Sequence, residues 1–75
     1  MGKKNRKLIA YRKAAGFTQN DMALFLDINQ TTYSKKENGK ADFTEKEMAT
    51  AYEKLFIVLA TTYPDLKITD IFFGS

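Results

Sequence analysis

Four residues near the middle of this sequence, Gln30, Thr31, Ser34 and Lys35, carry polar groups that suit the edges of DNA bases. On a helix the pairs 30/34 and 31/35 are each four residues apart, so all four side chains would share one face. A glutamine amide can bond adenine through N6 and N7, a threonine can touch a thymine methyl, and a lysine can reach guanine or a phosphate. Taken alone, these residues also fit an ordinary solvated helix face.

The elements that would position this face are two short helices joined by a corner of three residues. The first helix is predicted over residues 18–26. The Thr18 hydroxyl can accept a hydrogen bond from a free backbone N–H group, and the Asp21 carboxylate stands at the capping-box position three residues later. The second is predicted over residues 30–37, with Asn29 as its cap. Two amphipathic helices around so short a corner have the geometry of a helix-turn-helix.

The residues of this unit also follow the pattern of a known family. The matching positions are Gln19, Ala23, Ile28, Gln30 and the run Glu37, Asn38, Gly39 and Lys40. In these residues the sequence resembles the Cro/repressor-type (Xre-like) helix-turn-helix proteins of phages and bacteria. The resemblance extends from Leu8 to about residue 50 and returns from Ile68 to Phe73.

Three positions depart from the family's pattern. Asp27 stands where a glycine is usual, although aspartate is among the few other residues that tolerate a positive φ. Tyr33 stands where the core usually has valine or isoleucine, and Lys36 stands where apolar residues are common. These departures concern the local packing of the helices.

The resemblance implies an all-α fold, a compact bundle of about five helices of the lambda-repressor type, with residues 1–75 as one domain. It implies that Gln30, Thr31 and Lys35 contact bases in the major groove, with Ser34 on the same face. Four residues are implied to contact the DNA backbone: Gln19, Asn29, Asn38 and Lys40.

The resemblance further implies an ion pair between Arg12, in the first helix, and Glu37, at the end of the second helix of the unit. A planar guanidinium can hold a carboxylate through two hydrogen bonds, so such a pair would tie the two helices together. The alternative is two unrelated exposed charges.

Three more helices are predicted around this unit. One covers residues 5–15 and stops at Gly16 in a left-handed conformation. A long helix follows Thr44, the first residue of a T-x-x-E capping box, and Pro64 sets its limit. A short helix capped by Thr69 closes the sequence, with Ile68 and Phe73 packing across its start. The inward stripe expected on the long helix is Met48, Tyr52, Leu55, Leu59 and Tyr63.

Several apolar residues have no assigned place in this scheme. Leu24 and Phe25 cannot both face the core of the helix pair. There is also more apolar surface than one helical stripe needs, at residues 56–58, Ile71 and Phe72. This surface could fill the core or form a homodimer interface. The resemblance favours a homodimer, formed in solution or only on DNA, which would present two recognition helices about 34 Å apart.

Charge and composition set the remaining bounds. The net charge is +3, and residues 1–16 carry six basic and no acidic residues, which fits either a polyanionic partner or a solvated basic helix. The absence of Cys and His excludes disulfides and the usual zinc sites and suits a cytoplasmic location. No apolar run approaches the roughly 20 residues of a membrane span, and secretion is not expected. Since no catalytic group or phosphate-binding loop is recognisable, no enzyme, cofactor, metal or small-molecule ligand is expected.

The sequence therefore predicts a sequence-specific DNA-binding transcription regulator, a small repressor of phage or mobile-element type that binds a palindromic operator. One alternative is a DNA-binding antitoxin or a restriction-modification controller. Another is a protein-interaction module that keeps the fold but binds no DNA, which the absence of DNA binding at about 50 mM salt would favour.

Overall fold

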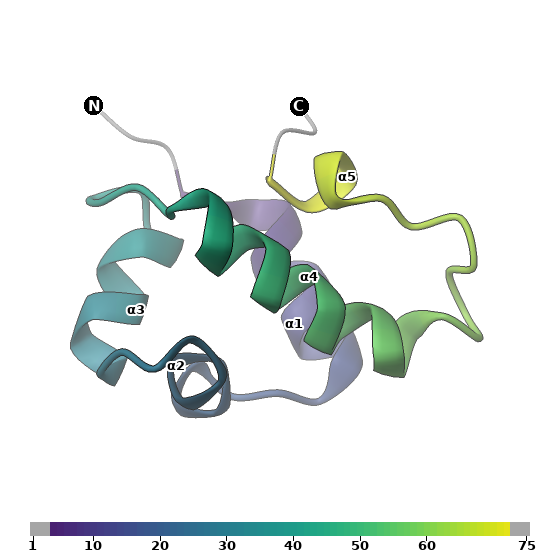
Figure 1. Cartoon of the computed structure of the whole chain (residues 1–75), viewed down its shortest axis with the longest axis horizontal. Coiled ribbons are helices and arrows are strands. Elements are labelled where there is room, and N and C mark those ends of the chain that lie inside the picture. Colours follow the sequence, from purple (N-terminus) through teal and green to yellow (C-terminus); the bar gives the residue numbers. More distant parts are fainter. Residues whose placement is uncertain (1–3, 73–75) are drawn as a thin grey trace.

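The computed structural model describes residues 4–72, which form five helices and, within that range, no strand (Figure 1). The helices are α1 (Arg6–Ala15), α2 (Gln19–Leu26), α3 (Gln30–Glu37), α4 (Glu45–Leu59) and α5 (Ile68–Phe72). Helix α4 crosses the molecule diagonally, with α2 and α3 toward one end and the segment 60–67 at the other. The expected all-helical bundle is confirmed. Among the described helices, none is both long enough and apolar enough to span a bilayer.

Side chains at the starts of four helices satisfy backbone N–H groups that the helix leaves free. Thr18 and Thr44 each accept a hydrogen bond from the N–H three residues later, and the carboxylate at that later position accepts one from the threonine N–H. Asn5 and Asn29 accept from the first turns of α1 and α3 in the same way. The predicted caps of α2, α3 and α4 are therefore confirmed.

The corner between α2 and α3 is closed by a residue in the left-handed conformation. Asp27 has φ 58°, and its N–H donates to Leu24 O, while the N–H of Ile28 donates to Ala23 O at 3.0 Å. Aspartate tolerates this backbone better than most residues other than glycine, which explains how it occupies a position where glycine is usual. The same conformation at Gly16, φ 81°, ends α1 as predicted.

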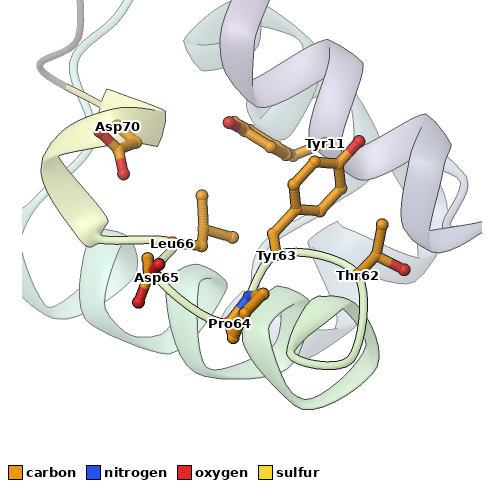
Figure 2. A pocket seen from close by; sticks show the side chains of 7 residues that line it. All are labelled: Tyr11, Thr62, Tyr63, Pro64, Asp65, Leu66 and Asp70. Carbon is orange, nitrogen blue, oxygen red and sulfur yellow. The ribbon is translucent and has the colours of Figure 1, made fainter.

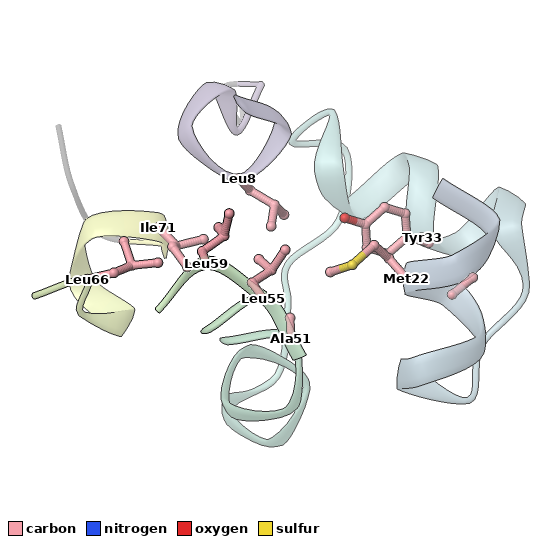
Figure 3. Close-up of a cluster of buried hydrophobic side chains, with 9 residues drawn as sticks. Leu8, Met22, Tyr33, Ala51, Leu55, Leu59, Leu66 and Ile71 are labelled. Carbon is pink, nitrogen blue, oxygen red and sulfur yellow. The ribbon is translucent and has the colours of Figure 1, made fainter. Parts of the chain in front are cut away.

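One hydrophobic core joins all five helices (Figure 3). Helix α4 contributes Ala51, Leu55 and Leu59, which recur every four residues and so lie on one face. The complete buried apolar set is Leu8, Met22, Ala23, Tyr33, Ala51, Leu55, Leu59, Leu66 and Ile71. Since α2 and α3 pack into this core through Met22 and Tyr33, the helix pair is part of the bundle and not an appendage.

The C-terminal third differs from the prediction in two places. Helix α4 ends at Leu59, five residues before Pro64, and Tyr63 leaves the helical stripe with 42% of its surface exposed. Helix α5 begins at Ile68, so Thr69 lies inside it and is not its cap. Instead the Asp70 carboxylate accepts a bond from the N–H of Lys67 at 2.9 Å. The expected contact of Phe73 lies outside the described residues.

The unplaced apolar residues divide between core and surface. Ile71 is buried, and Phe72 packs edge-on against Phe43 with ring centroids 5.3 Å apart, so both belong to the core. On α4, Ile57 is 75% exposed and Val58 is 45% exposed. On α2, Leu24 is 69% exposed, whereas Phe25 packs against the core and against the Phe17 ring.

Candidate nucleic-acid interface

Helix α3 presents its polar face outward. Gln30, Thr31 and Lys35 are exposed, and Ser34 is half-buried. The cap at Asn29 fixes the start of the helix, because its side chain accepts a bond from the N–H of Thr32 at 2.7 Å. No described part of the chain covers Gln30 or Thr31, so their amide and hydroxyl groups are open to a ligand.

The residues expected to contact the DNA backbone lie around this helix but differ in solvent exposure and in hydrogen bonding. Asn29 and Lys40 are exposed, whereas Gln19 and Asn38 are half-buried. The Gln19 amide donates to Glu37 Oε1 at 3.0 Å, which uses one of its two N–H groups. The Asn38 amide donates to Ser34 Oγ at 3.3 Å, which couples a residue of the expected backbone set to one of the expected base-contacting set.

Behind the polar face, Arg12 and Glu37 form a buried ion pair. Arg12 Nε donates to Glu37 Oε2 at 2.8 Å, and Arg12 Nη2 donates to Oε1 at 3.1 Å, a bidentate arrangement. A third nitrogen, Nη1, donates to the carbonyl of Phe17 in the α1–α2 loop at 3.0 Å. The pair therefore holds α1, the loop before α2 and the end of α3 together.

Two further side chains complete the shell of Glu37. The Tyr33 hydroxyl donates to Glu37 Oε2 at 2.7 Å, and the amide of Gln19, at the start of α2, donates to Glu37 Oε1. Burial alone would raise the pKa of Glu37, but the hydrogen bonds from Arg12, Gln19 and Tyr33 outweigh it and lower that pKa. Burial, with the hydrogen bond and charge of Glu37, raises the pKa of Tyr33 above its usual range.

Sequence reasoning missed this role of the Tyr33 hydroxyl. The available signal was its spacing from Glu37, since residues four apart on a helix are neighbours. A tyrosine in place of the usual aliphatic residue therefore adds a hydrogen bond to the ion pair while it fills the core.

A second ion pair, also missed, joins α3 to α4. Lys36 Nζ lies 2.5 Å from Glu47 Oε1, and the two side chains retain only 13% and 14% of their accessible surface. Glu47 also accepts from the N–H of Thr44, so its carboxylate serves both the pair and the cap of α4. Burial opposes ionisation, but Lys36 and these hydrogen bonds lower the pKa of Glu47. Lys36 thus replaces the apolar contact that is common at its position.

The start of α1 lies next to the end of α3. The N–H of Asn5 donates to the carbonyl of Glu37 at 2.8 Å. Lys4 and Arg6, on either side of Asn5, are exposed. The basic beginning of the described chain therefore extends the positive charge that Lys35 brings to α3.

Comparison with protein families gives a match to helix-turn-helix over residues 8–52, more than half of the chain. The matched region runs from the first buried residue of α1 to the middle of α4 and includes the whole α2–corner–α3 unit. Neither the curated proteins nor the solved structures gave a match. Since this match covers more than half of the chain, the chain belongs to the Cro/C1-type (Xre-like) helix-turn-helix family of DNA-binding regulators.

Proposed function

We propose that this protein is a sequence-specific transcription regulator whose helix α3 enters the major groove of an operator. The observation that carries the proposal is the two-sided character of α3. Tyr33 and Glu37 are buried and bonded on its inner side, while Gln30, Thr31 and Lys35 are exposed on the other. A helix held in this way loses little freedom on binding, so its polar groups can discriminate between base edges.

Phosphate contacts would set the position of α3 on the duplex, because backbone contacts fix register and orientation while base contacts specify sequence. The start of α2 favours an anion, since the helix dipole is positive there. The proposed backbone contacts are Gln19, Asn29, Asn38 and Lys40. Lys4 and Arg6, beside the end of α3, supply further positive charge to the same surface.

The proposal includes a homodimer on a palindromic operator, in the manner of a small phage or mobile-element repressor in which residues 1–75 act as one domain. A single recognition helix contacts only a few base pairs, whereas a two-fold dimer contacts two half-sites about one helical turn apart. Ile57 and Val58 support an interface on α4, because both are exposed apolar side chains next to each other. Ile71 and Phe72 do not contribute, since they pack into the core.

The direct test is selection of bound sequences from random DNA by the full chain, at a salt concentration near 100 mM. We expect an inverted repeat whose half-sites are about 10 base pairs apart. The matched control is Gln30→Ala, which should lose preference at one position of each half-site. Uniform recovery of all sequences would overturn sequence-specific recognition, and a motif without two-fold symmetry would overturn the dimer.

A second candidate function, a DNA-binding antitoxin that also holds a protein partner, is favoured by one observation. Leu24 is 69% exposed on α2, on an element that the DNA-binding proposal uses only at its start. Co-expression with the product of a neighbouring gene, followed by co-purification, tests this candidate. Loss of the complex in Leu24→Ser with DNA affinity retained would favour it over a simple repressor.

A further inference from the structure

A surface cavity of about 330 Å³ lies between α1, the segment 60–67 and α5 (Figure 2). Among its lining residues only Tyr11 belongs to the region matched by the helix-turn-helix family, and the others follow α4. Most of the cavity wall is therefore built by residues that lie beyond the matched region. Its size lies at the lower end of the range of small-ligand sites.

The walls of the cavity are aromatic. Tyr11 and Tyr63 meet edge to face, with ring centroids 5.5 Å apart and ring planes at 86°. Pro64 and Leu66 add apolar surface beside them. The face of a tyrosine ring carries partial negative charge, so it attracts a cation that comes within about 6 Å of its centre.

Two carboxylates lie at the same cavity. Asp65 is exposed, and Asp70 is half-buried with one oxygen bonded to the N–H of Lys67. Within residues 4–72 neither carboxylate forms an ion pair. Basic residues do stand near lining residues in the chain, namely Arg12 and Lys13 after Tyr11 and Lys67 after Leu66. The lining thus offers negative charge and ring faces, and no basic side chain lines it.

The cavity is held open by hydrogen bonds that do not involve a ligand. The Tyr52 hydroxyl, on α4, donates to the carbonyl of Leu66 at 2.7 Å. The N–H of Leu66 donates to the carbonyl of Tyr63 at 3.1 Å, and the N–H of Tyr63 donates to Leu59 O at 2.7 Å. Because Leu66 is itself buried, the segment is fixed to the core, and a ligand would find the site already formed.

We propose that this cavity binds an organic cation, an alkylammonium or guanidinium group. The group would lie against the Tyr63 ring and pair with Asp65 and Asp70. It could come from a free amine or from a lysine or arginine side chain of a partner protein. The segment 60–67 lies at the opposite end of the molecule from α3 (Figure 1), so the cavity stays accessible with α3 in a groove. The proposal goes beyond the proposed DNA binding and does not depend on it.

The test is a titration of the full chain, labelled with ¹⁵N, with N-acetyl-argininamide, followed by amide NMR shifts. We expect saturable shifts confined to residues near the cavity, with a dissociation constant on the order of 1 mM. Asp65→Asn should weaken binding by about threefold to fivefold, and Tyr63→Leu should do the same while it keeps the wall apolar. The matched control is Asp42→Asn, an exposed carboxylate in the α3–α4 loop, which should leave binding unchanged.

Two results would overturn the proposal. Equal binding of N-acetyl-norleucinamide, which lacks the charge, would reduce the cavity to an apolar depression. Equal weakening by Asp42→Asn and Asp65→Asn would reduce it to diffuse attraction. The source of the cation is separated by comparing butylamine with a glycine-flanked arginine peptide: tighter binding of the peptide assigns a protein partner, and tighter binding of the amine assigns a small molecule. Amide spectra of the variants without ligand check that each is folded: shifts should be confined to neighbours of the substituted residue.

Discussion

Glu37 is the residue through which α1 and α2 hold α3 in place. Its two carboxylate oxygens accept four hydrogen bonds, two from Arg12 and one each from Gln19 and Tyr33. The carboxylate is almost fully buried, and no buried side-chain polar atom in the described chain lacks a partner. Removal of one member of such a group leaves an unpaired buried charge, which costs more than the pair contributes.

Arg12→Ala should lower the melting temperature far more than Lys13→Ala. The first change leaves Glu37 buried and unpaired, at a cost of about 3–5 kcal/mol. The second removes an exposed charge with no partner in the described structure, and the expected effect is within about 0.5 kcal/mol. Thermal unfolding followed by circular dichroism measures both, and equal effects would show that the buried pair does not stabilise the fold.

Acidification should destabilise the protein through Glu37. The pKa of Glu37 is lower in the folded state than its ordinary value of 4.5, so the ionised carboxylate stabilises the fold above that value. This contribution is lost as the pH falls from 4.5 through the folded pKa. Glu37→Gln should be less stable by about 3 kcal/mol at pH 7, and the difference should shrink between pH 5 and the folded pKa. Urea unfolding at a series of pH values checks this, and parallel pH profiles would contradict it.

Gln30→Ala and Lys40→Ala should affect DNA binding in different ways. Loss of a base contact at Gln30 should cost about 1–3 kcal/mol on the operator and relax one base position. Loss of a phosphate contact at Lys40 should weaken binding to all sequences alike and reduce the salt slope by about one. Gel-shift titrations on operator and random DNA at several salt concentrations separate the two effects. Unchanged affinity and specificity in Gln30→Ala would mean that this face of α3 does not contact bases.

At the scale of elements, short-range rules predicted most of the helix boundaries. Thr18, Asn29 and Thr44 cap their helices through side chains that the sequence already identifies, and both α2 and α3 end where expected. These features depend on residues within four positions of each other, so no tertiary information is needed. The same rules placed the polar face of α3, because a helix of known start and length has a known periodicity.

Apart from the Tyr33–Glu37 hydrogen bond and the start of α5, the features that escaped prediction depend on residues far apart in the sequence. Helix α4 ends at Leu59, where no glycine or proline marks a stop, and the segment that follows places Leu66 in the core. From the sequence, Lys36 is a departure that concerns the local packing of the helices. In the structure its ammonium group pairs with Glu47, eleven residues away on another helix. The cavity at Tyr11 and Tyr63 joins the two ends of the chain and has no local pattern at all.

The contact between α3 and α4 can be measured by a double-mutant cycle on Lys36 and Glu47. Lys36→Met supplies the apolar group that is common at this position, and Glu47→Gln keeps an acceptor for the cap of α4. We expect a coupling free energy of about 1 kcal/mol, because both side chains are largely buried and the pair is screened less than a surface pair. Urea unfolding of the four proteins gives this value, and a coupling near zero would mean that the two helices are held by apolar contacts alone.

At the scale of the whole molecule, the proposed activities occupy separate regions. Helix α3 lies at one end of the bundle and the segment 60–67 at the other, with α4 running between them (Figure 1). The exposed apolar residues Ile57 and Val58 lie in the last turns of α4. A dimer formed there would leave α3 free in both copies, as two-fold recognition requires.

Ile57→Ser should abolish dimerisation without loss of monomer stability. The side chain is 75% exposed, so its removal leaves no core cavity, but it removes apolar area from the proposed interface. Sedimentation of the protein with and without operator DNA should show a shift to monomer, together with a loss of cooperative binding to the two half-sites. Leu24→Ser is the matched control on α2, and identical behaviour of Ile57→Ser and the unaltered protein would exclude this interface.

The hydrogen bond from the Asn5 N–H to the carbonyl of Glu37 has a practical consequence for any laboratory that handles this protein. It anchors Asn5 at the end of α3, so a purification tag or fluorophore fused to the N-terminus joins the described chain close to the proposed DNA-binding helix. The charge of a polyhistidine or acidic leader there would change the measured DNA affinity. A label attached within the segment 60–67, at the other end of the bundle, would report the same association without that bias.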